Sequence, residues 1–286
     1  MRYSQIRAFH NVALHGGFSR AADAIMQTQP ALSEQVRRLE QDHDVLLFHR
    51  DKKGVRLTET GKSLFLLTKQ FFEVEQQLED YLSESSAGVE GQLRIVADSA
   101  HHITAILGRF RKKYPNVYIS LRTGNTTEIL DDLRAYNAEI GVVGSLPTSG
   151  EFDVVDLGTT AIYAISKKGY LPKGVSSLSL NELRGEPLVF REIGSKTRQK
   201  LTDAAIAKGI ELRPALEVEG REAMREVVAA GAGVGFVSDA EFGNDNRLVK
   251  IPLKGVSLEM RESIVCMAAR REVRTIRAFM EVAAKA

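Results

Sequence analysis

Hydroxyl-bearing and basic side chains in residues 191–198 have the types and spacing that bind a small anion. Two hydroxyls and two cations follow one another there: Ser195, Lys196, Thr197 and Arg198. If a helix begins in this segment, its unpaired N–H groups and its dipole favour negative charge. Ordinary capping of that helix by Ser195 explains the segment equally well. Further donors at the end of another expected strand, Asn125 and Thr126, favour a small anionic effector.

Two adjacent histidines, His101 and His102, form a second group of candidate site residues. Their side chains are of a type that could ligate a metal. Adjacent side chains usually diverge, and we expect no cysteine or carboxylate at ligand spacing beside them. Hydrogen-bonded or solvent-facing histidines are therefore favoured, and we expect no metal ion. Their position is more informative, because ligands bind at the carboxyl ends of strands in α/β folds. We expect effector contacts at four successive residues: Ser99, Ala100, His101 and His102.

Catalytic and cofactor sites are disfavoured by the arrangement of the remaining candidate residues. The glycines of residues 231–235 follow an expected helix and precede an expected strand, whereas a dinucleotide site needs a strand, glycines and then a helix. We interpret them as a tight helix-to-strand turn. The single cysteine, Cys266, excludes an internal disulfide, and we expect it to be buried and unreactive. With no nucleophile–base grouping, the sequence predicts neither catalysis nor a cofactor.

The first sixty residues predict two short helices joined by a tight turn. In the first helix apolar residues recur at helical spacing: Phe18, Ala21, Ala22, Ile25 and Met26. In the second, Thr28 suits the N-cap, Pro30 suits the first helical position, and Leu32, Val36 and Leu39 form an apolar stripe. Its other face carries polar residues that suit a DNA major groove: Gln29, Ser33, Gln35, Arg37 and Arg38. An ordinary solvated face has the same pattern, so both interpretations stay open here.

A basic segment after the helix pair favours DNA. Four cations within seven residues flank Gly54: Arg50, Lys52, Lys53 and Arg56. We expect a short β-hairpin, or wing, that contacts phosphates, in preference to a plain basic surface turn. Because the net charge is only +2, this inference depends on local arrangement and not on the total.

A long helix from about residue 60 to 83 is expected next. Its apolar residues alternate in spacing between three and four, as in a coiled-coil seam: Leu64, Leu67, Phe71, Val74, Leu78 and Tyr81. Charged residues surround this narrow stripe, which favours pairing with a second copy over packing within one chain. We expect a homodimer that assembles further into a homotetramer, and a hinge at residues 83–88.

Alternating strands and helices after residue 91 predict two α/β lobes. The expected first lobe spans about 91–161 and 266–286, and the second about 162–265. Parallel strand–helix–strand units are the predicted construction. The domain boundaries we expect are 1–60 for the winged helix-turn-helix, 61–87 for the linker and 88–286 for effector binding.

Five blocks resemble, in order and spacing, the LysR-type transcription regulators. They are Phe18-Ser19-Arg20-Ala21-Ala22, Gln29-Pro30-Ala31-Leu32-Ser33, Arg38-Leu39-Glu40, Leu47-Phe48-His49-Arg50 and Leu57-Thr58-Glu59-Thr60-Gly61. The resemblance implies a helix-turn-helix from Phe18 to Arg37. It also implies DNA contacts from the second helix and its cap: Thr28, Gln29, Pro30, Ser33 and Arg37. The chain departs from the family at Asp44, where glycine is usual, and we expect a small local cost in stability.

The resemblance continues through the rest of the chain. It implies a periplasmic-binding-protein-like effector domain, matched in its second lobe at Arg221-Glu222-Ala223, Ala229-Ala230-Gly231 and Gly233-Val234-Gly235. More narrowly, the chain looks like a subgroup associated with aminoethylphosphonate catabolism. The blocks are Arg7-Ala8-Phe9-His10, Gly194-Ser195-Lys196-Thr197-Arg198, Arg221-Glu222-Ala223 and Ala240-Glu241-Phe242-Gly243. This implies a phosphonate effector, with Arg221 among its contacts.

The combined expectation is a ligand-responsive regulator that binds double-stranded DNA at an interrupted inverted repeat. No expected segment has the length and apolarity to cross a membrane, and the first residues carry no export signal, so we expect a cytoplasmic protein. A solute-binding transport protein would need export and would have no use for residues 1–87. An α/β enzyme is disfavoured by the missing catalytic grouping.

Overall fold

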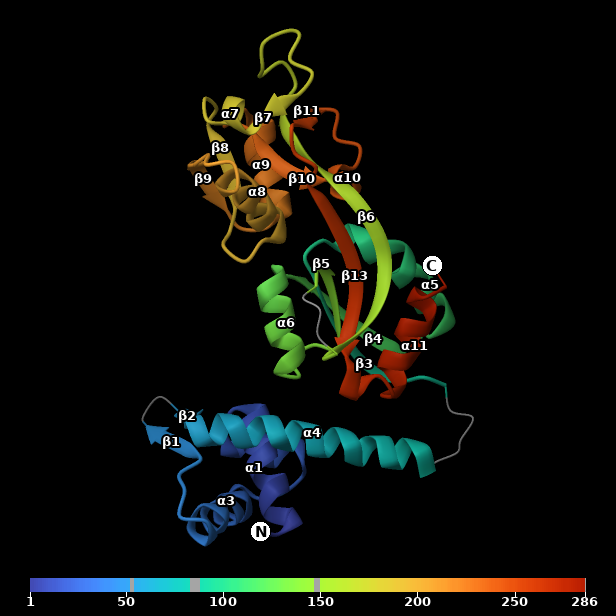
Figure 1. Cartoon of the computed structure of the whole chain (residues 1–286). Coiled ribbons are helices and arrows are strands. Elements are labelled where there is room, and N and C mark those ends of the chain that lie inside the picture. Colours follow the sequence, from blue (N-terminus) through green and yellow to red (C-terminus); the bar gives the residue numbers. More distant parts are fainter. Residues whose placement is uncertain (52–53, 83–87, 147–149, 286) are drawn as a thin grey trace. The chain divides into compact units, whose positions relative to one another are not determined.

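The computed structural model describes residues 1–51, 54–82, 88–146 and 150–285 (Figure 1). Contacts divide the chain into two compact units, Met1–Ser85 and Ser86–Ala286. Within the described residues, no helix combines the length and apolar character that crossing a membrane requires.

The first unit contains the expected helix pair. Its helices are α1 (Tyr3–His15), α2 (Phe18–Ala24), α3 (Gln29–Asp42) and α4 (Glu59–Leu82). The Thr28 hydroxyl accepts a hydrogen bond from the Ala31 N–H at 3.4 Å, so Thr28 caps α3 as predicted. Pro30 occupies the second helical position rather than the first, because the helix begins at Gln29. The helix pair shares one apolar core with α1 and the start of the wing, which includes Phe9, Ala21, Leu32, Val36 and Phe48.

The predicted apolar face of α2 is wrong at its end. Helix α2 stops at Ala24, and Met26 lies in the turn with a left-handed φ of 54° and its side chain 95% exposed. A chain reversal is needed there before α3 can begin, and the reversal overrides helical periodicity. Asp44, after α3, also has a left-handed φ of 50°, as the departure from the family's glycine implied.

The expected hairpin is present as β1 (Phe48–Asp51) and β2 (Gly54–Leu57), which pair antiparallel. Helix α4 follows directly, and its length of 24 residues corresponds to about 36 Å. Within the unit, Leu64 packs against the apolar core. The next four seam residues are exposed in the single chain: Leu67, Phe71, Val74 and Leu78. The side chain of Tyr81, the last predicted seam residue, lies outside the described part.

In the second unit, the first lobe is a sheet with helices on both faces. Strand β3 (Gly91–Ala97) pairs in parallel with β4 (Val117–Thr123) and β5 (Ile140–Gly144), which confirms the predicted parallel units. Helix α6 (Thr126–Arg134) covers one face of the sheet (Figure 1). Helices α5 (Thr104–Lys113) and α11 (Arg274–Ala283) cover the other. A 3-10 turn, η1 (Ala100–Ile103), follows β3, and a second, η2 (Ala268–Arg270), precedes α11.

The second lobe contains shorter strands and helices. Its strands are β7 (Leu178–Ser179), β8 (Leu188–Arg191), β9 (Pro214–Val218), β10 (Gly235–Ser238), β11 (Leu248–Ile251) and β12 (Leu253–Lys254). Its helices are α7 (Leu180–Leu183), α8 (Lys196–Ile206), α9 (Arg221–Ala230) and α10 (Asp239–Phe242). The glycine cluster lies between α9 and β10, as predicted. A Cβ at Gly233 would come within 2.1 Å of the Pro187 carbonyl oxygen, so only glycine fits this turn.

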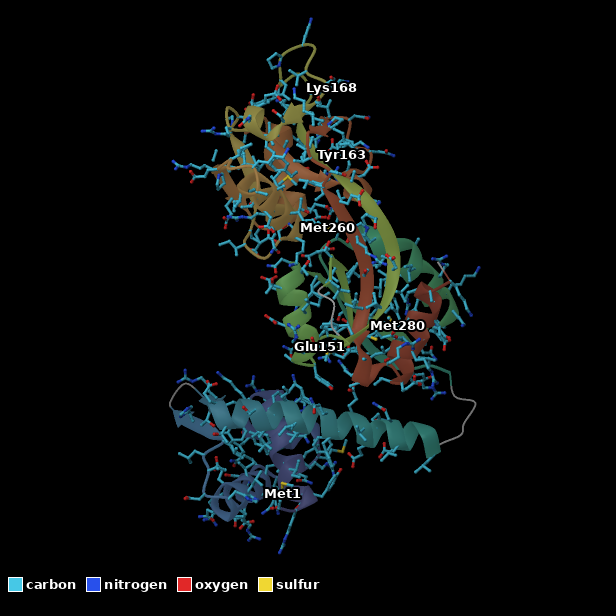
Figure 2. All side chains as sticks on the ribbon, in the orientation of Figure 1. Met1, Glu151, Tyr163, Lys168, Met260 and Met280 are labelled. Carbon is cyan, nitrogen blue, oxygen red and sulfur yellow. The ribbon has the colours of Figure 1, made fainter. Side chains whose placement is uncertain are left out.

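Two long antiparallel strands, β6 (Phe152–Lys167) and β13 (Glu259–Met267), connect the lobes (Figure 1). Strand β6 pairs with β10 and β11 in the second lobe, and β13 pairs with β5 in the first. The expected lobe boundaries, near residues 161 and 265, therefore fall inside continuous strands. Met260 lies where β13 passes between the lobes (Figure 2).

We predict that Met26→Gly stabilises the protein. A non-glycine residue in the left-handed region costs about 1–2 kcal/mol. The greater freedom of glycine in the unfolded chain offsets about 0.5–1 kcal/mol of that relief, so the free energy of unfolding should rise by at most about 1.5 kcal/mol. Urea denaturation measures the change. Met26→Ala retains its Cβ and is the control; an equal gain from alanine would contradict the backbone explanation. Asp44→Gly should gain less, because aspartate tolerates this conformation better.

Candidate functional site

The two lobes of the second unit enclose a small polar cavity of about 10 Å³, enough for about one water molecule. Its lining comes from both lobes and from β13: Asp98, Thr126, Arg191, Ser195, Lys196, Thr197, Glu241, Met260 and Glu262. A second cavity of about 40 Å³ shares Asp98 and Arg191 with it. Four residues predicted to contact an effector thus meet at one place, namely Thr126, Ser195, Lys196 and Thr197.

The start of α8 forms the anion-binding side of this cavity. Ser195 is the N-cap residue of α8 and is 3% exposed. In the described part of the chain, its hydroxyl oxygen has no hydrogen-bond partner. The hydroxyl is therefore not used for ordinary capping. Arg191, at the end of β8, lines the same cavity and is buried beside Glu192, whose carboxylate accepts from the Arg191 Nη2 at 2.7 Å. Donors and a cation thus converge on the helix N-terminus.

Arg198 has a different place from the one predicted. Its Nη1 donates to the Arg191 carbonyl at 2.7 Å and to the Glu217 carboxylate at 2.5 Å. It is not one of the described residues that line either cavity. Arg198 therefore connects the first turn of α8 to the ends of β8 and β9.

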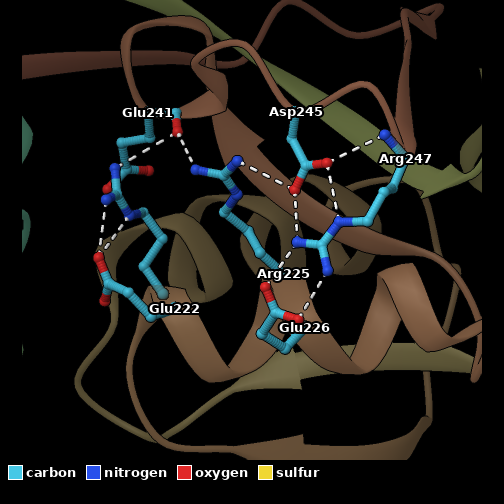
Figure 3. A network of polar contacts seen from close by, with 7 residues as sticks. Glu222, Arg225, Glu226, Glu241, Asp245 and Arg247 are labelled. Atoms are coloured by element: carbon cyan, nitrogen blue, oxygen red, sulfur yellow. Dashed lines mark hydrogen bonds and ion pairs between the residues drawn. The ribbon is translucent and has the colours of Figure 1, made fainter.

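The second cavity contains two other predicted residues, Asn125 and Arg221. Asn125 caps α6, because its side-chain oxygen accepts from the Glu128 N–H at 3.1 Å. The Arg221 guanidinium donates to the Glu222 carboxylate at 2.7 Å and to the Glu241 carbonyl at 3.3 Å. Figure 3 shows the network around these contacts, in which Arg225, Glu226, Asp245 and Arg247 continue the chain of ion pairs. The network attaches α9 to the segment that carries Glu241.

The histidine pair diverges as expected, but the prediction of no carboxylate nearby is wrong. His101 is exposed, whereas the side chain of His102 is only 6% exposed. The His102 Nε2 lies 3.6 Å from the Glu262 Oε1, which comes from β13 and is remote in sequence. Ser99 caps η1 by accepting from the His101 N–H at 3.3 Å. None of the four predicted contacts, Ser99, Ala100, His101 and His102, is among the described residues that line the two cavities.

Three carboxylates line the cavity, half-buried Asp98 and buried Glu241 and Glu262, and the sequence analysis predicted none of them as a contact. Burial, and then the neighbouring Glu241 charge, raises the pKa of Asp98 to about 7. Burial, and then the charge of Asp98, raises the pKa of Glu262 to about 9. Burial lowers the pKa of His102. One available signal was the position of Asp98 directly after β3; nothing local pointed to Glu262.

Asp98, His102 and Glu262, which we call the acceptor cluster, have side chains of metal-ligating types. One such atom from each lies within 4.8 Å of the others. In the described residues, Asp98 Oδ1, His102 Nε2 and Glu262 Oε2 are buried without a hydrogen-bond partner. The expectation of no metal stays a prediction.

The other predicted surface belongs to the first unit. At the start of α3, Thr28, Gln29 and Pro30 are exposed, and Ser33 is half-buried. Arg37 is exposed but donates two hydrogen bonds to Glu34, at 2.9 and 3.0 Å. These bonds, and one from Arg38, lower the pKa of Glu34 to about 2.

In the wing, Arg56 is exposed. The side chain of Arg50, and both Lys52 and Lys53, lie outside the described residues.

Cys266 is fully buried, and burial raises the pKa of its thiol to about 12, which disfavours the reactive thiolate.

Stability should fall with rising pH because of Glu262. The pKa of the Glu262 carboxyl is higher in the folded protein than its unfolded value of 4.5. Its contribution to stability is therefore fully present below pH 4.5. This contribution is lost as the pH rises toward about 9. We predict that Glu262→Gln, which resembles the protonated group, flattens the decline of the melting temperature over this range. Glu259→Gln, an exposed site on the same strand, is the control. Parallel curves for the Glu262 variant and the wild type would contradict the assignment.

Two family models match the chain. The LysR substrate binding domain matches residues 86–286, and the bacterial regulatory helix-turn-helix protein, lysR family, matches residues 3–62. The HTH-type transcriptional activator CmpR of Synechocystis is 26% identical over 236 residues, covering 82% of this chain and 78% of CmpR.

Solved structures share the fold. Full-length CbnR, a LysR family transcriptional regulator, in complex with its target DNA has a TM-score of 0.67 and 20% identity, with 100% of this chain and 99% of that chain covered. The regulatory domain of CcmR from Synechocystis in complex with 2-PG has a TM-score of 0.62 and 20% identity, with 68% and 97% covered.

The winged helix-turn-helix, the two-lobed α/β unit and the two matching family models lead to one assignment. The chain belongs to the LysR family: it is a DNA-binding transcription regulator with a small-molecule effector-binding domain, and not an enzyme.

Proposed function

We propose that a small anionic effector binds between the two lobes and controls how the regulator reads its DNA. The buried N-cap hydroxyl of Ser195 is the observation that carries this proposal, because within the described residues it has no partner. An uncompensated buried hydroxyl is costly, and an anion on the α8 N-terminus would accept its hydrogen bond. Thr197, Lys196 and Arg191 line the same cavity and supply further donors.

We infer that the effector is a phosphonate, with 2-aminoethylphosphonate as the first compound to test. Phosphonate oxygens accept several hydrogen bonds, including paired bonds from an arginine. The CcmR regulatory domain, which shares this fold, is solved with the ligand 2-PG, and supports a small-ligand site in this kind of domain. Asn125 and Arg221, in the adjoining cavity, are proposed as further contacts.

Effector binding requires the lobes to open or rearrange, since the cavity holds about one water molecule. The effector then changes regulation only by its different affinity for two arrangements of the protein. Strands β6 and β13, which pass continuously from lobe to lobe, are the elements that must bend.

For DNA recognition, we propose that the N-terminal part of α3 enters the major groove and that the wing contacts phosphates. Thr28, Gln29, Pro30, Ser33 and Arg37 form the proposed base-reading and positioning surface. Arg50, Lys52, Lys53 and Arg56 form the proposed phosphate contacts. The crystal structure of full-length CbnR with its target DNA supports DNA binding by a chain of this fold.

We further propose a cytoplasmic homodimer through α4, able to pair into a tetramer, with functional segments at 1–60, 61–87 and 88–286. Four seam residues are 46–59% exposed in the single chain, and a second copy would cover them: Leu67, Phe71, Val74 and Leu78. Two-fold symmetry then predicts an interrupted inverted repeat as the operator.

We predict that Gln29→Ala loses sequence discrimination. A bidentate contact between glutamine and a base contributes about 1–3 kcal/mol against the wrong base. Affinity for the operator should therefore fall while affinity for random DNA is unchanged, as measured by fluorescence anisotropy at fixed salt. Gln41→Ala, an exposed glutamine at the far end of α3, is the control. Equal losses on both DNAs would remove Gln29 from base reading.

We predict that Ser195→Ala weakens anion binding without weakening the fold. A hydrogen bond to a charged ligand contributes about 1.5–3 kcal/mol, or roughly 10- to 100-fold in affinity. Calorimetric titration with 2-aminoethylphosphonate, phosphate esters and simple carboxylates measures the loss. Ser179→Ala is the control, because Ser179 caps α7 through its hydroxyl and lies away from the cavity lining. If Ser195→Ala binds every anion as wild type does, the anion site is elsewhere.

A further inference from the structure

The acceptor cluster of Asp98, His102 and Glu262 brings together atoms that need a donor or a cation. Their atoms Oδ1, Nε2 and Oε2 are buried and have no hydrogen-bond partner in the described part of the chain. The Glu262 and His102 side chains are 4% and 6% exposed, and one ligating atom from each of the three residues lies within 4.8 Å of the others. Acceptors that face one another away from water carry a large desolvation cost.

The residues around the cluster compensate this cost only in part, through the positive charge of Arg191. Arg191 and Arg221, the buried arginines nearby, each pair with the carboxylate of the next residue, Glu192 and Glu222. Glu241 lines the same cavity and adds negative charge. The Asp98 Oδ2 accepts a hydrogen bond from the Gly144 N–H at 2.9 Å, and the other carboxylate oxygen, Oδ1, is left for another donor.

We propose that the acceptor cluster binds the ammonium group of a zwitterionic effector, whose anionic group lies on the Ser195 side of the same cavity. This inference rests on the proposed anion site and adds the second half of the ligand. An ammonium group has three N–H donors and one positive charge. Its charge favours the ionised form of Glu262, so binding releases the Glu262 proton to solvent and all three side chains then accept hydrogen bonds. Asp98 and Glu262 line one cavity together with Ser195 and Thr197, so a ligand with few bonds between its two charges would reach both sides.

A monovalent cation fits this environment better than a divalent metal. Arg191 lines the same cavity and interacts electrostatically with Asp98 and Glu262, and its positive charge opposes a second charge on the cation. Anion-binding groups in the same cavity also require a ligand of both signs. A divalent metal ion in the acceptor cluster is the alternative to an ammonium group, and the experiment must distinguish the two.

The experiment compares ligand pairs that differ only in an ammonium or a methyl group. These are 2-aminoethylphosphonate against n-propylphosphonate, and β-alanine against butyrate. Calorimetric titration of the full chain should show that the ammonium member of a pair binds about tenfold or more tightly. Glu262→Gln should remove this preference without changing the affinity for the methyl member. Glu259→Gln, on the same strand but exposed, should keep it.

Each other outcome has a distinct meaning. Equal binding of the ammonium and methyl members by the wild type overturns the ammonium site and leaves the anion proposal standing, with no variant required. Binding of propylammonium as tightly as 2-aminoethylphosphonate supports the cation site and overturns the anion proposal. If Zn²⁺ or Mn²⁺ binds, is lost in Glu262→Gln and is kept in Glu259→Gln, while no ammonium preference is seen, the cluster is a metal site. If no ligand or metal binds, both proposals fail.

Discussion

The antiparallel pairing of β6 with β13 is the constraint on which the second unit depends. Each strand contributes to both lobes, so the lobes share a continuous hydrogen-bonded ladder and not a flexible linker. The register shifts between Glu262 and Ser263, where the ladder has an irregularity. From Glu262 to Cys266 every residue of β13 is buried, because apolar clusters cover both faces of the strand there. The same ladder that joins the lobes therefore holds a carboxylate between them.

The arginines at the cavity are each paired with the glutamate that follows them in sequence, whereas the carboxylates have no such full partner among the described residues. Arg191 and Arg221 are each paired with a neighbouring glutamate, so their charges are largely satisfied within the second lobe. Asp98 and Glu262 approach from the first lobe and from β13, and their raised pKa values record the cost of that burial. A site of this kind sacrifices stability of the empty domain, and a ligand with complementary charges would recover it.

In the first unit, one apolar core orients the surface of α3 that is proposed to read DNA. Leu32, Val36 and Leu39 hold α3 against the core, which leaves the opposite residues exposed at its N-terminal end. Glu34 lies on that helix and engages both Arg37 and Arg38, so these cations are preorganised and partly neutralised before DNA arrives. Since the exposed ion pairs contribute little to stability, their importance lies in positioning the guanidinium groups.

Local patterns in the sequence were sufficient for the helix pair, the hairpin and the glycine turn, because each depends on neighbours within a few residues. The parallel strand units followed from the alternation of strands and helices along the chain. Four cavity residues could also be predicted from the sequence, because helix starts and strand ends are recognisable locally. They are Thr126, Ser195, Lys196 and Thr197. Tertiary structure alone decided that α2 ends before Met26, that Arg198 pairs with the ends of two strands, and that Glu262 lies beside His102. The two members of that last pair are separated by most of the effector domain in sequence. Only the strand pairing that crosses both lobes brings them together, and no local periodicity encodes that register.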